Sequence, residues 1–336
     1  MKKENSHITI EDIANLAGVA KSTVSRVINN SGAVSQKTRD KVMAVIDAHQ
    51  FVPNVMASDL GRQLTSSIGI FIGDISNQYY TEILAGLESA VSAYDYFPFI
   101  CLAINEKRES FYVQEMLRRR VSGVVVASTN IYDMSLFENL AQTTTVVTIQ
   151  TDIPGTIKID CTNEAGTFEM INTLISLGHQ KIAYLDSSGE NAVLEARKSG
   201  YLKALSAHNL PRVMAYEKTA APFENGYHVT QALLALSERP TAIHAANDHL
   251  AAGAYLALRD AGLHIPEDIS LSGFDGLQSS SLMSPPLSTV VQPIHEMGKT
   301  AITTLFSLLQ EEAPQVSSPI LFPTELLLRG SIAPPK

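Results

Sequence analysis

Apolar residues recur at helical spacing in two short runs near the start of the chain, within residues 8–29. Thr9 is a good N-cap for the first run, and Gly18 supplies a sharp turn after it. The second run extends from about Lys21 to Asn29. The pattern predicts two helices, with apolar faces formed by Ile10, Ile13, Ala14 and Leu16 in the first and by Val24, Val27 and Ile28 in the second.

A third helix is predicted to begin within Val34–Arg39, and Pro53 ends this unit. Two short helices joined by a tight turn and followed by a third are typical of a helix-turn-helix. The second helix of that motif lies in the major groove of DNA. An ordinary buried pair of helices is the alternative interpretation.

The next segment, Asn54–Arg62, has the ends of a very short helix, because Asn54 can cap one and Gly61 can stop one. A helix of about two turns falls below the ~12 residues that an isolated helix usually needs in water. We therefore predict that this segment folds only when something packs on it. It would act as a linker and as a potential switch.

From Ser67 onward, short β-rich runs alternate with helical runs. Such a series predicts parallel sheets covered by helices, and its length indicates two such domains in tandem. The strand candidates are Ile68–Ile72, Pro98–Leu102, Gly123–Ala127, Val146–Ile149, Lys181–Leu185, Ala242–Ala245 and Ile269–Gly273. The helix candidates are Thr81–Ala93, Phe111–Arg119, Glu164–Leu177, Arg197–His208, Gly226–Ser237 and His249–Ala261.

Polar residues follow several predicted strands, and ligands of open parallel sheets bind beyond the carboxyl ends of the strands. These residues are Asp74, Asp160, Asn247, Asp248 and Asp275. Each one alone could be a helix cap or a turn residue, but together they predict a polar cleft.

Two further features of this region suit a small polyhydroxylated ligand. Tyr79 and Tyr80 can present aromatic faces to the C–H groups of a sugar, although core packing is the alternative for them. Arg197 offers a planar donor fork, and carboxylates and amides can hold hydroxyl groups as bidentate partners.

The charge of the chain is unevenly distributed. The net charge is −9, yet residues 1–66 hold eight Lys or Arg and six Asp or Glu, whereas the remainder holds 17 and 28. A mildly basic head on an acidic body fits a head that touches phosphate and a body that does not. The triplet Arg118–Arg120 is interpreted as a solvated helix end rather than as a phosphate site.

Several classes of protein are not indicated by the sequence. The polar start predicts no signal peptide, and no run of about 18 apolar residues predicts a membrane span. Cys101 and Cys161 are far apart, which suggests a reducing cytosol and no metal site. We find no GxSxG, HExxH or Walker motif, so we expect neither a catalytic set nor a cofactor.

Many ordered stretches of the chain resemble the lactose/galactose-repressor family of bacterial transcription factors. They include TIEDIANLAGVAKSTVSRVIN, VSQKTRDKV, PNVMASDL, IGIFIGDISNQYYTEI, LGHQKIAYL, RKSGY, AANDHLAAG, PEDISLSGFD, TVVQP and LLLRGS. The resemblance implies an all-α helix-turn-helix head, a hinge helix, and an α/β core of two doubly wound parallel-sheet subdomains similar to periplasmic sugar-binding proteins.

The domain boundaries follow from the same resemblance. The head is expected at 1–53 and the hinge at 54–66. The N-subdomain of the core would take 67–158 with 291–320, and the C-subdomain 159–290 with 321–336. Members of the family dimerise through the core and read pseudo-palindromic operators in double-stranded DNA.

The resemblance also implies roles for individual residues. Lys21, Ser22 and Arg26 would read the major groove, and Arg26 could pair bidentately with a guanine. The expected phosphate contacts are Thr9, Thr23, Asn29 and Ser35. Leu60 would be a minor-groove wedge, with Asn54 and Ala57 beside it. The expected effector-cleft residues are Asp74, Tyr79, Tyr80, Gln150, Asp160, Arg197, Phe223, Asn247, Asp275 and Gln292.

Some positions depart from the family's pattern. Ala20 replaces a serine before the recognition helix, and Asp59 brings an acidic side chain into the hinge. Gln150 replaces an aspartate that often grips sugar hydroxyls, and Cys161 replaces an asparagine. These differences bear on the effector more than on the fold.

The sequence therefore predicts a cytoplasmic, homodimeric repressor of carbohydrate-utilisation genes, whose operator affinity is controlled by a small ligand. A neutral sugar is the expected effector, and a purine stacked on Tyr79 or Tyr80 is the alternative. A sugar-binding transport protein and an enzyme with a DNA-binding head are the competing classes of function.

Overall fold

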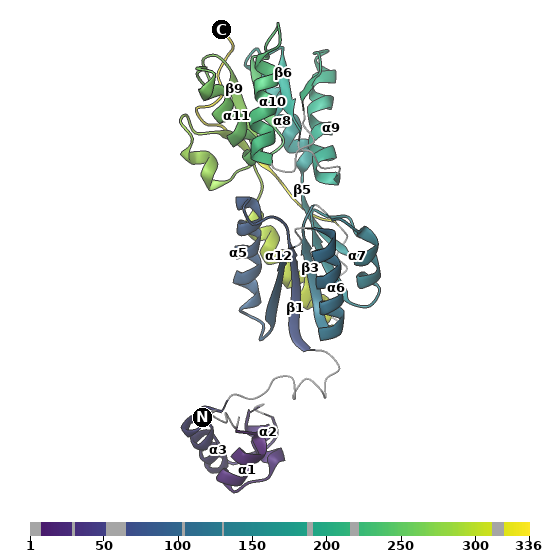
Figure 1. Cartoon of the computed structure of the whole chain (residues 1–336), viewed down its shortest axis with the longest axis vertical. Coiled ribbons are helices and arrows are strands. Elements are labelled where there is room, and N and C mark those ends of the chain that lie inside the picture. The colour runs from purple at the N-terminus through teal and green to yellow at the C-terminus, as the bar shows by residue number, and fades with distance from the viewer. Residues whose placement is uncertain are drawn as a thin grey trace, which may run out of the picture. The chain divides into compact units, whose positions relative to one another are not determined.

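A computed structural model describes residues 8–28, 31–51, 65–102, 105–129, 131–186, 191–215, 222–310 and 319–336. The chain divides into two compact units, Met1–Thr65 and Ser66–Lys336. Figure 1 shows the three helices of the first unit and, in the second unit, two separate sheets that are each covered by helices.

The described residues of the first unit form three helices, as the hydrophobic pattern predicts: α1 (Ile10–Ala17), α2 (Lys21–Ile28) and α3 (Gln36–Ala48). Their buried residues are Ile13, Ala14, Ala17, Val24, Val27 and Val42. Leu16 was predicted to face this core, but it is 53% exposed. The buried face of α1 follows Ile13 and Ala17, four residues apart, so the side chain just before Ala17 points outward.

The ends of α1 agree with the sequence-based prediction. Thr9 is the N-cap, and its hydroxyl accepts from the backbone N–H of Asp12 while the Asp12 carboxylate accepts from the N–H of Thr9. Gly18 ends the helix in the left-handed region, with φ of 58°. A residue without Cβ adopts this conformation at little cost, which explains the tight turn into α2.

The first sheet of the core has six strands in the order β11-β5-β4-β3-β1-β2. They are β1 (Thr65–Ile72), β2 (Phe97–Leu102), β3 (Val121–Ala127), β4 (Thr145–Ile149), β5 (Ile157–Cys161) and β11 (Ile320–Phe322). Side chains alternate between the faces of the sheet. Ile70 packs with α5 (Gln78–Val91) and α12 (Ile294–Leu309), whereas Phe71 packs with α6 (Glu106–Arg119) and α7 (Met134–Ala141).

The second sheet also has six strands, in the order β12-β10-β9-β8-β6-β7. They are β6 (Ile182–Leu185), β7 (Val213–Ala215), β8 (Ala242–Ala245), β9 (Ser270–Asp275), β10 (Ser288–Val291) and β12 (Glu325–Leu327). Among the described strands of this sheet, β12 is antiparallel to its neighbour β10 and the other neighbours pair in parallel. The covering helices are α8 (Asn163–Ser176), α9 (Ala192–Ala207), α10 (Pro222–Leu234) and α11 (Asp248–Asp260), and a short 3-10 helix, η1, covers Gln278–Leu282.

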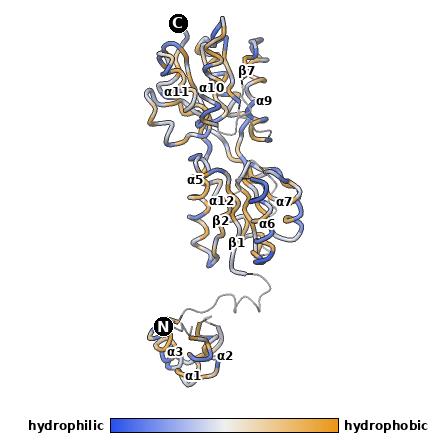
Figure 2. Tube along the Cα trace, viewed as in Figure 1, coloured by the Kyte–Doolittle hydropathy of each residue, from blue (hydrophilic) through white to orange (hydrophobic). Residues whose placement is uncertain are grey.

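The chain passes between the two sheets after β5, after β10 and after β11. The subdomain boundaries expected from the resemblance, at 158/159, 290/291 and 320/321, fall within a few residues of these crossings and stay predictions. Hydrophobic residues concentrate in the strands, and hydrophilic residues lie on the outer helix faces and loops (Figure 2). None of the helices in the described part of the chain is both long and apolar enough to cross a membrane.

Candidate functional site

The second helix of the head presents a polar face. Lys21, Ser22 and Arg26 of α2 are exposed, and Ser22 and Arg26 are four residues apart, so they lie on the same side of the helix. The guanidinium of Arg39 in α3 donates to the carbonyl of Val27 over 3.3 Å, which holds α3 against the end of α2. The arrangement is that of a helix-turn-helix with a recognition helix available to DNA.

The expected phosphate contacts have capping roles in the structure. The hydroxyl of Thr9 donates to Asp12 over 2.6 Å, and Ser35 caps α3 by accepting from the N–H of Thr38. Thr23 is half-buried in the first turn of α2. Their role at phosphates stays a prediction. The other expected DNA-binding residues, Asn29, Asn54, Ala57 and Leu60, lie outside the described residues.

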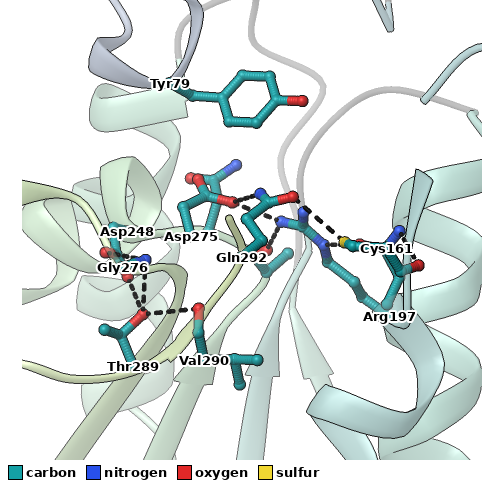
Figure 3. A network of polar contacts seen from close by, with 12 residues as sticks. Tyr79, Cys161, Arg197, Asp248, Asp275, Gly276, Thr289, Val290 and Gln292 are labelled. Atoms are coloured by element: carbon teal, nitrogen blue, oxygen red, sulfur yellow. Dashed lines mark hydrogen bonds and ion pairs between the residues drawn. The ribbon is translucent and has the colours of Figure 1, made fainter. Parts of the chain in front are cut away.

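Side chains from both sheets of the core meet in one polar network (Figure 3). Gln150, just after β4, donates to the side-chain carbonyl of Gln292 over 3.0 Å. Gln292 follows β10 and donates to Asp275, at the end of β9, over 2.7 Å. The carboxyl ends of the two sheets therefore face a common region, which is where ligands of such sheets bind.

Arg197 of α9 extends this network from the second sheet. Its Nη1 donates to Asp275 over 3.1 Å and to the carbonyl of Ala246 over 2.7 Å, and its Nε donates to Asn163 over 2.9 Å. The guanidinium lies 3.7 Å from the ring centroid of Phe274, a cation–π contact. Arg197 is buried, so these contacts fix the orientation of its guanidinium group.

A second carboxylate, that of Asp248, stabilises the turn that follows Asp275. Asp248, the first residue of α11, accepts the backbone N–H groups of Gly276 and Leu277 and the hydroxyl of Thr289. These bonds hold the turn that follows Asp275, whose own φ is 121°. Burial raises the pKa of Asp275, and Arg197 opposes that shift. Burial and the nearby Asp275 carboxylate also raise the pKa of Asp248, to about 7.

The two tyrosines predicted for the cleft lie in the first turn of α5 and are buried. The hydroxyl of Tyr79 donates to Gln150 over 2.7 Å, and its ring lies over Asp275 and Gln292 in Figure 3. Tyr80 shares a hydrogen bond with Thr129 over 3.1 Å, and the two rings meet edge to face. Tyr79 therefore joins the network through its hydroxyl group, whereas Tyr80 packs beside it.

Three other predicted cleft residues have local structural roles. The carboxylate of Asp74 is exposed and accepts from Ser76, the amide of Asn247 caps α11, and the ring of Phe223 lies edge to face against His249. Asp160 accepts from Asn163 and pairs with Lys158, so it reaches Arg197 only through Asn163. Direct contact of these residues with an effector stays a prediction.

Sequence reasoning left out two residues that hold the network. Asn163 links Asp160 to Arg197, and Thr289 donates to Asp248. Neither has a signal in the sequence, because an asparagine or threonine next to a strand is common in turns and caps. Cys161 was noted only as a departure; its thiol donates to Gln292 over 3.2 Å, and burial raises its pKa to about 12.

The two parts of the core are also joined by a contact between α5 and η1. The amide oxygen of Gln78 in α5 accepts from the backbone N–H of Ser279 in η1 over 3.1 Å. The carboxylate of Glu82 accepts from the amide of Gln78 and from the backbone N–H of Gln278. We call this contact the α5–η1 contact. The contact links the element that follows β1 to the element that follows β9.

No group of three or more His, Cys, Asp or Glu side chains in the described ranges is arranged to hold a metal ion. The network instead offers carboxylate, amide and guanidinium groups and the hydroxyl of a buried tyrosine. These groups can bind a small polar molecule by hydrogen bonds.

Comparison with known proteins agrees with this arrangement. Residues 9–54 match the family described as bacterial regulatory proteins, lacI family, and residues 171–332 match a periplasmic binding protein-like domain. Catabolite control protein A of Priestia megaterium is 31% identical over 97% of this chain and 99% of that protein. The ribose operon repressor of Haemophilus influenzae is 32% identical over 96% of this chain and 98% of that protein.

The fold comparison gives the same result. The lac repressor dimer bound to operator and the anti-inducer ONPF has a TM-score of 0.85 and 28% identity, with 97% of this chain and 99% of that chain covered. The protein therefore belongs to the LacI family of bacterial transcription regulators. It is a DNA-binding regulator controlled by a ligand, and the family consists of regulators rather than enzymes.

The raised pKa of Asp248 gives a test of the buried carboxyl. Because its pKa is about 7 in the folded protein against 3.8 ordinarily, the folded state holds a proton that the unfolded state has lost. Asp248 therefore destabilises the fold progressively as pH rises from about 4 to 7. We expect the difference in melting temperature between Asp248→Asn and wild type to grow in favour of the variant over this range. Thermal unfolding at several pH values measures it, and a difference that is constant with pH would contradict the assignment.

Proposed function

We propose that the protein is a homodimeric repressor in the bacterial cytoplasm, whose affinity for a pseudo-palindromic operator depends on a neutral sugar in the cleft. Cytoplasmic location follows from its partner, since the operator is chromosomal DNA. In this proposal Lys21, Ser22 and Arg26 read base edges, and Leu60 of the hinge enters the minor groove. The dimeric relative bound to operator supports this arrangement.

The pairing of cations with carboxylates favours an uncharged effector. Arg197 is paired with Asp275, and Lys158 lies 2.7 Å from Asp152 and 3.1 Å from Asp160. These pairs leave little uncompensated positive charge in the described part of the cleft for a phosphate or a sugar acid. Side-chain amides and a carboxylate beside the face of Tyr79 instead match the hydroxyl rim and C–H face of a sugar.

The coupling between cleft and operator requires two arrangements of the subdomains. A ligand shifts an equilibrium only through its different affinity for the two states, and couplings of ~1–3 kcal/mol are typical. Gln150 and Gln292 lie where the chain crosses between the sheets, and the α5–η1 contact lies on another side. An effector bound to Asp275 and Arg197 would therefore act on groups that already connect both subdomains.

A thermal-shift screen with ribose, glucose, galactose, glucose 6-phosphate, guanine and hypoxanthine tests the effector class. We expect one or more of the neutral sugars to raise the melting temperature and to change retention of a selected palindromic duplex in a gel-shift assay. A response to glucose 6-phosphate or to a purine alone would contradict the neutral-sugar proposal. Failure to retain any palindromic duplex would contradict the repressor itself.

Substitution Arg26→Ala tests the reading of bases. A bidentate arginine–guanine pair contributes roughly 1–3 kcal/mol of discrimination, so operator affinity should fall roughly 5- to 150-fold and preference should relax at one position of each half-site. Selection from a randomised duplex library measures both. Lys41→Ala, an exposed basic residue of α3, is the control, and an unchanged base preference in Arg26→Ala would exclude that role.

Substitution Asp275→Asn tests the centre of the cleft while keeping an oxygen acceptor for Gln292. Hydrogen bonds to a charged group contribute ~1.5–3 kcal/mol, so the sugar concentration at half-response should rise roughly 10- to 150-fold. Operator binding without sugar should be retained. Asp268→Asn, an exposed residue bonded to Lys336, is the matched control. A wild-type dose–response in the Asp275 variant would place the effector elsewhere.

Substitution Gln78→Ala tests the α5–η1 contact. Loss of one net hydrogen bond of ~0.5–1.5 kcal/mol from one arrangement should change sugar-free operator affinity by roughly 2- to 13-fold. Linkage requires the midpoint of the sugar response to move as well. Gel-shift titrations with and without sugar measure both, with the exposed Gln142→Ala of α7 as control. If both quantities equal those of wild type, the contact does not differ between the two states.

A further inference from the structure

We propose that Arg118, Arg119 and Arg120 form a phosphate-binding surface on the core, which contacts the DNA backbone in addition to the head. We call these residues the arginine surface. The inference rests on the DNA-binding function of the family and goes beyond it, because the contact would come from the ligand-binding unit. The sequence alone favoured a solvated helix end for this triplet, and the structure shows which end of the core it occupies.

The triplet stands at the C-terminal end of α6 and is exposed. Arg118 and Arg119 close the helix, and Arg120 is its C-cap in the left-handed conformation, with φ of 52°. Glu115 accepts from Arg118 over 3.1 Å and pairs with Arg119 over 3.4 Å. The guanidinium of Arg119 lies 5.4 Å from the ring centroid of Phe99. Glu115 and the ring of Phe99 therefore orient Arg118 and Arg119 at the exposed end of the helix.

The triplet lies at the end of the core where the chain enters from the head. β3 begins at Val121, directly after Arg120, and β1 is its neighbour in the sheet. The N–H of Gly73 after β1 donates to the carbonyl of Ala127 at the end of β3, so the two strands run in the same direction. Their first residues, Thr65 and Val121, therefore share one edge of the sheet, which Figure 1 shows at the end of β1 and α6 away from the second sheet.

Chain connectivity limits how far this edge can lie from DNA that the head binds. Residues 52–64 join the last described residue of the head to β1, and a chain of that length spans at most about 45 Å when fully extended. A tether of this length gives the arginine surface a high effective concentration at the duplex. The opposite end of the first sheet belongs to the effector cleft, so the arginine surface is separate from that site.

Charge gives the physical reason for a contact with phosphate. Residues 67–336 hold 17 basic and 28 acidic side chains, so DNA repels this part of the chain as a whole. Arg118–Arg120 is nevertheless the longest run of basic residues in the sequence. A guanidinium matches phosphate geometry with two parallel donors, and each phosphate neutralised releases condensed counterions. A local positive surface at the chain entry would turn the repulsion into attraction.

The triple variant Arg118→Ala, Arg119→Ala, Arg120→Ala in the full-length protein tests this proposal. Affinity for a selected operator duplex is measured by fluorescence anisotropy from 50 to 300 mM KCl. Each lost phosphate contact should lower the slope of log affinity against log salt by about 0.9, so a dimer should lose about 2 or more. Affinity for an unrelated duplex should fall by the same factor as for the operator, because phosphate contacts carry no sequence information.

Two further variants keep the test independent of folding. Replacing the three arginines with lysine keeps the charge and should retain most of the wild-type slope. Arg259, which pairs with Asp260 in the C-subdomain, has a side chain that is 65% exposed, against 73% for Arg118. The variant Arg259→Ala should leave the salt slope unchanged.

An unchanged slope in the alanine variant would overturn the proposal. It would also be overturned if the lysine variant lost as much as the alanine variant, since the loss would then follow from the helix end and not from charge. Wild-type binding to the operator in the same titrations shows separately whether the repressor function holds.

Discussion

The ion pair between Arg197 and Asp275 is the interaction on which the polar network between the two sheets depends. Two opposite charges removed from water are costly unless each finds further partners. Here Asp275 also accepts from Gln292, and Arg197 also donates to Asn163 and to a backbone carbonyl. The pair is thereby fixed in direction, and the groups that fix it come from α8, α9, β9 and the crossing after β10. The same bonds that stabilise the core therefore fix the geometry of the proposed effector site.

This arrangement explains how a small ligand can act at a distance. Gln292 bonds both to Asp275 of the second sheet and to Gln150 of the first, so the two subdomains share one network at their crossing. A ligand that competes for any of these donors or acceptors changes the relative stability of two arrangements. The difference required is small, because couplings of ~1–3 kcal/mol already change affinity by 5- to 150-fold.

The two ends of the first sheet have different chemistry. The carboxyl ends carry neutral amides, paired charges and Tyr79, which suit a small uncharged molecule. The opposite end, where the chain enters from the head, carries three exposed arginines. A parallel sheet places all strand starts at one end and all strand ends at the other, so one fold separates the proposed effector site from the arginine surface.

The sequence by itself determined the helix-turn-helix and the two α/β subdomains, because hydrophobic spacing and the residues at helix ends are local properties. It also identified Tyr79, Gln150, Arg197, Asp275 and Gln292 as a group. The sequence did not distinguish this group from Asp74, Asn247 and Phe223. These three residues occupy similar places after strands or in helix turns, but their contacts in the structure are mainly local. The sequence also did not show that Asn163 and Thr289 hold the polar network in place. Nor did it show at which end of the first sheet Arg118–Arg120 lie. Only tertiary structure decides these points, because they depend on which strand ends meet across long stretches of chain, for example Gln150 and Gln292, which are 142 residues apart.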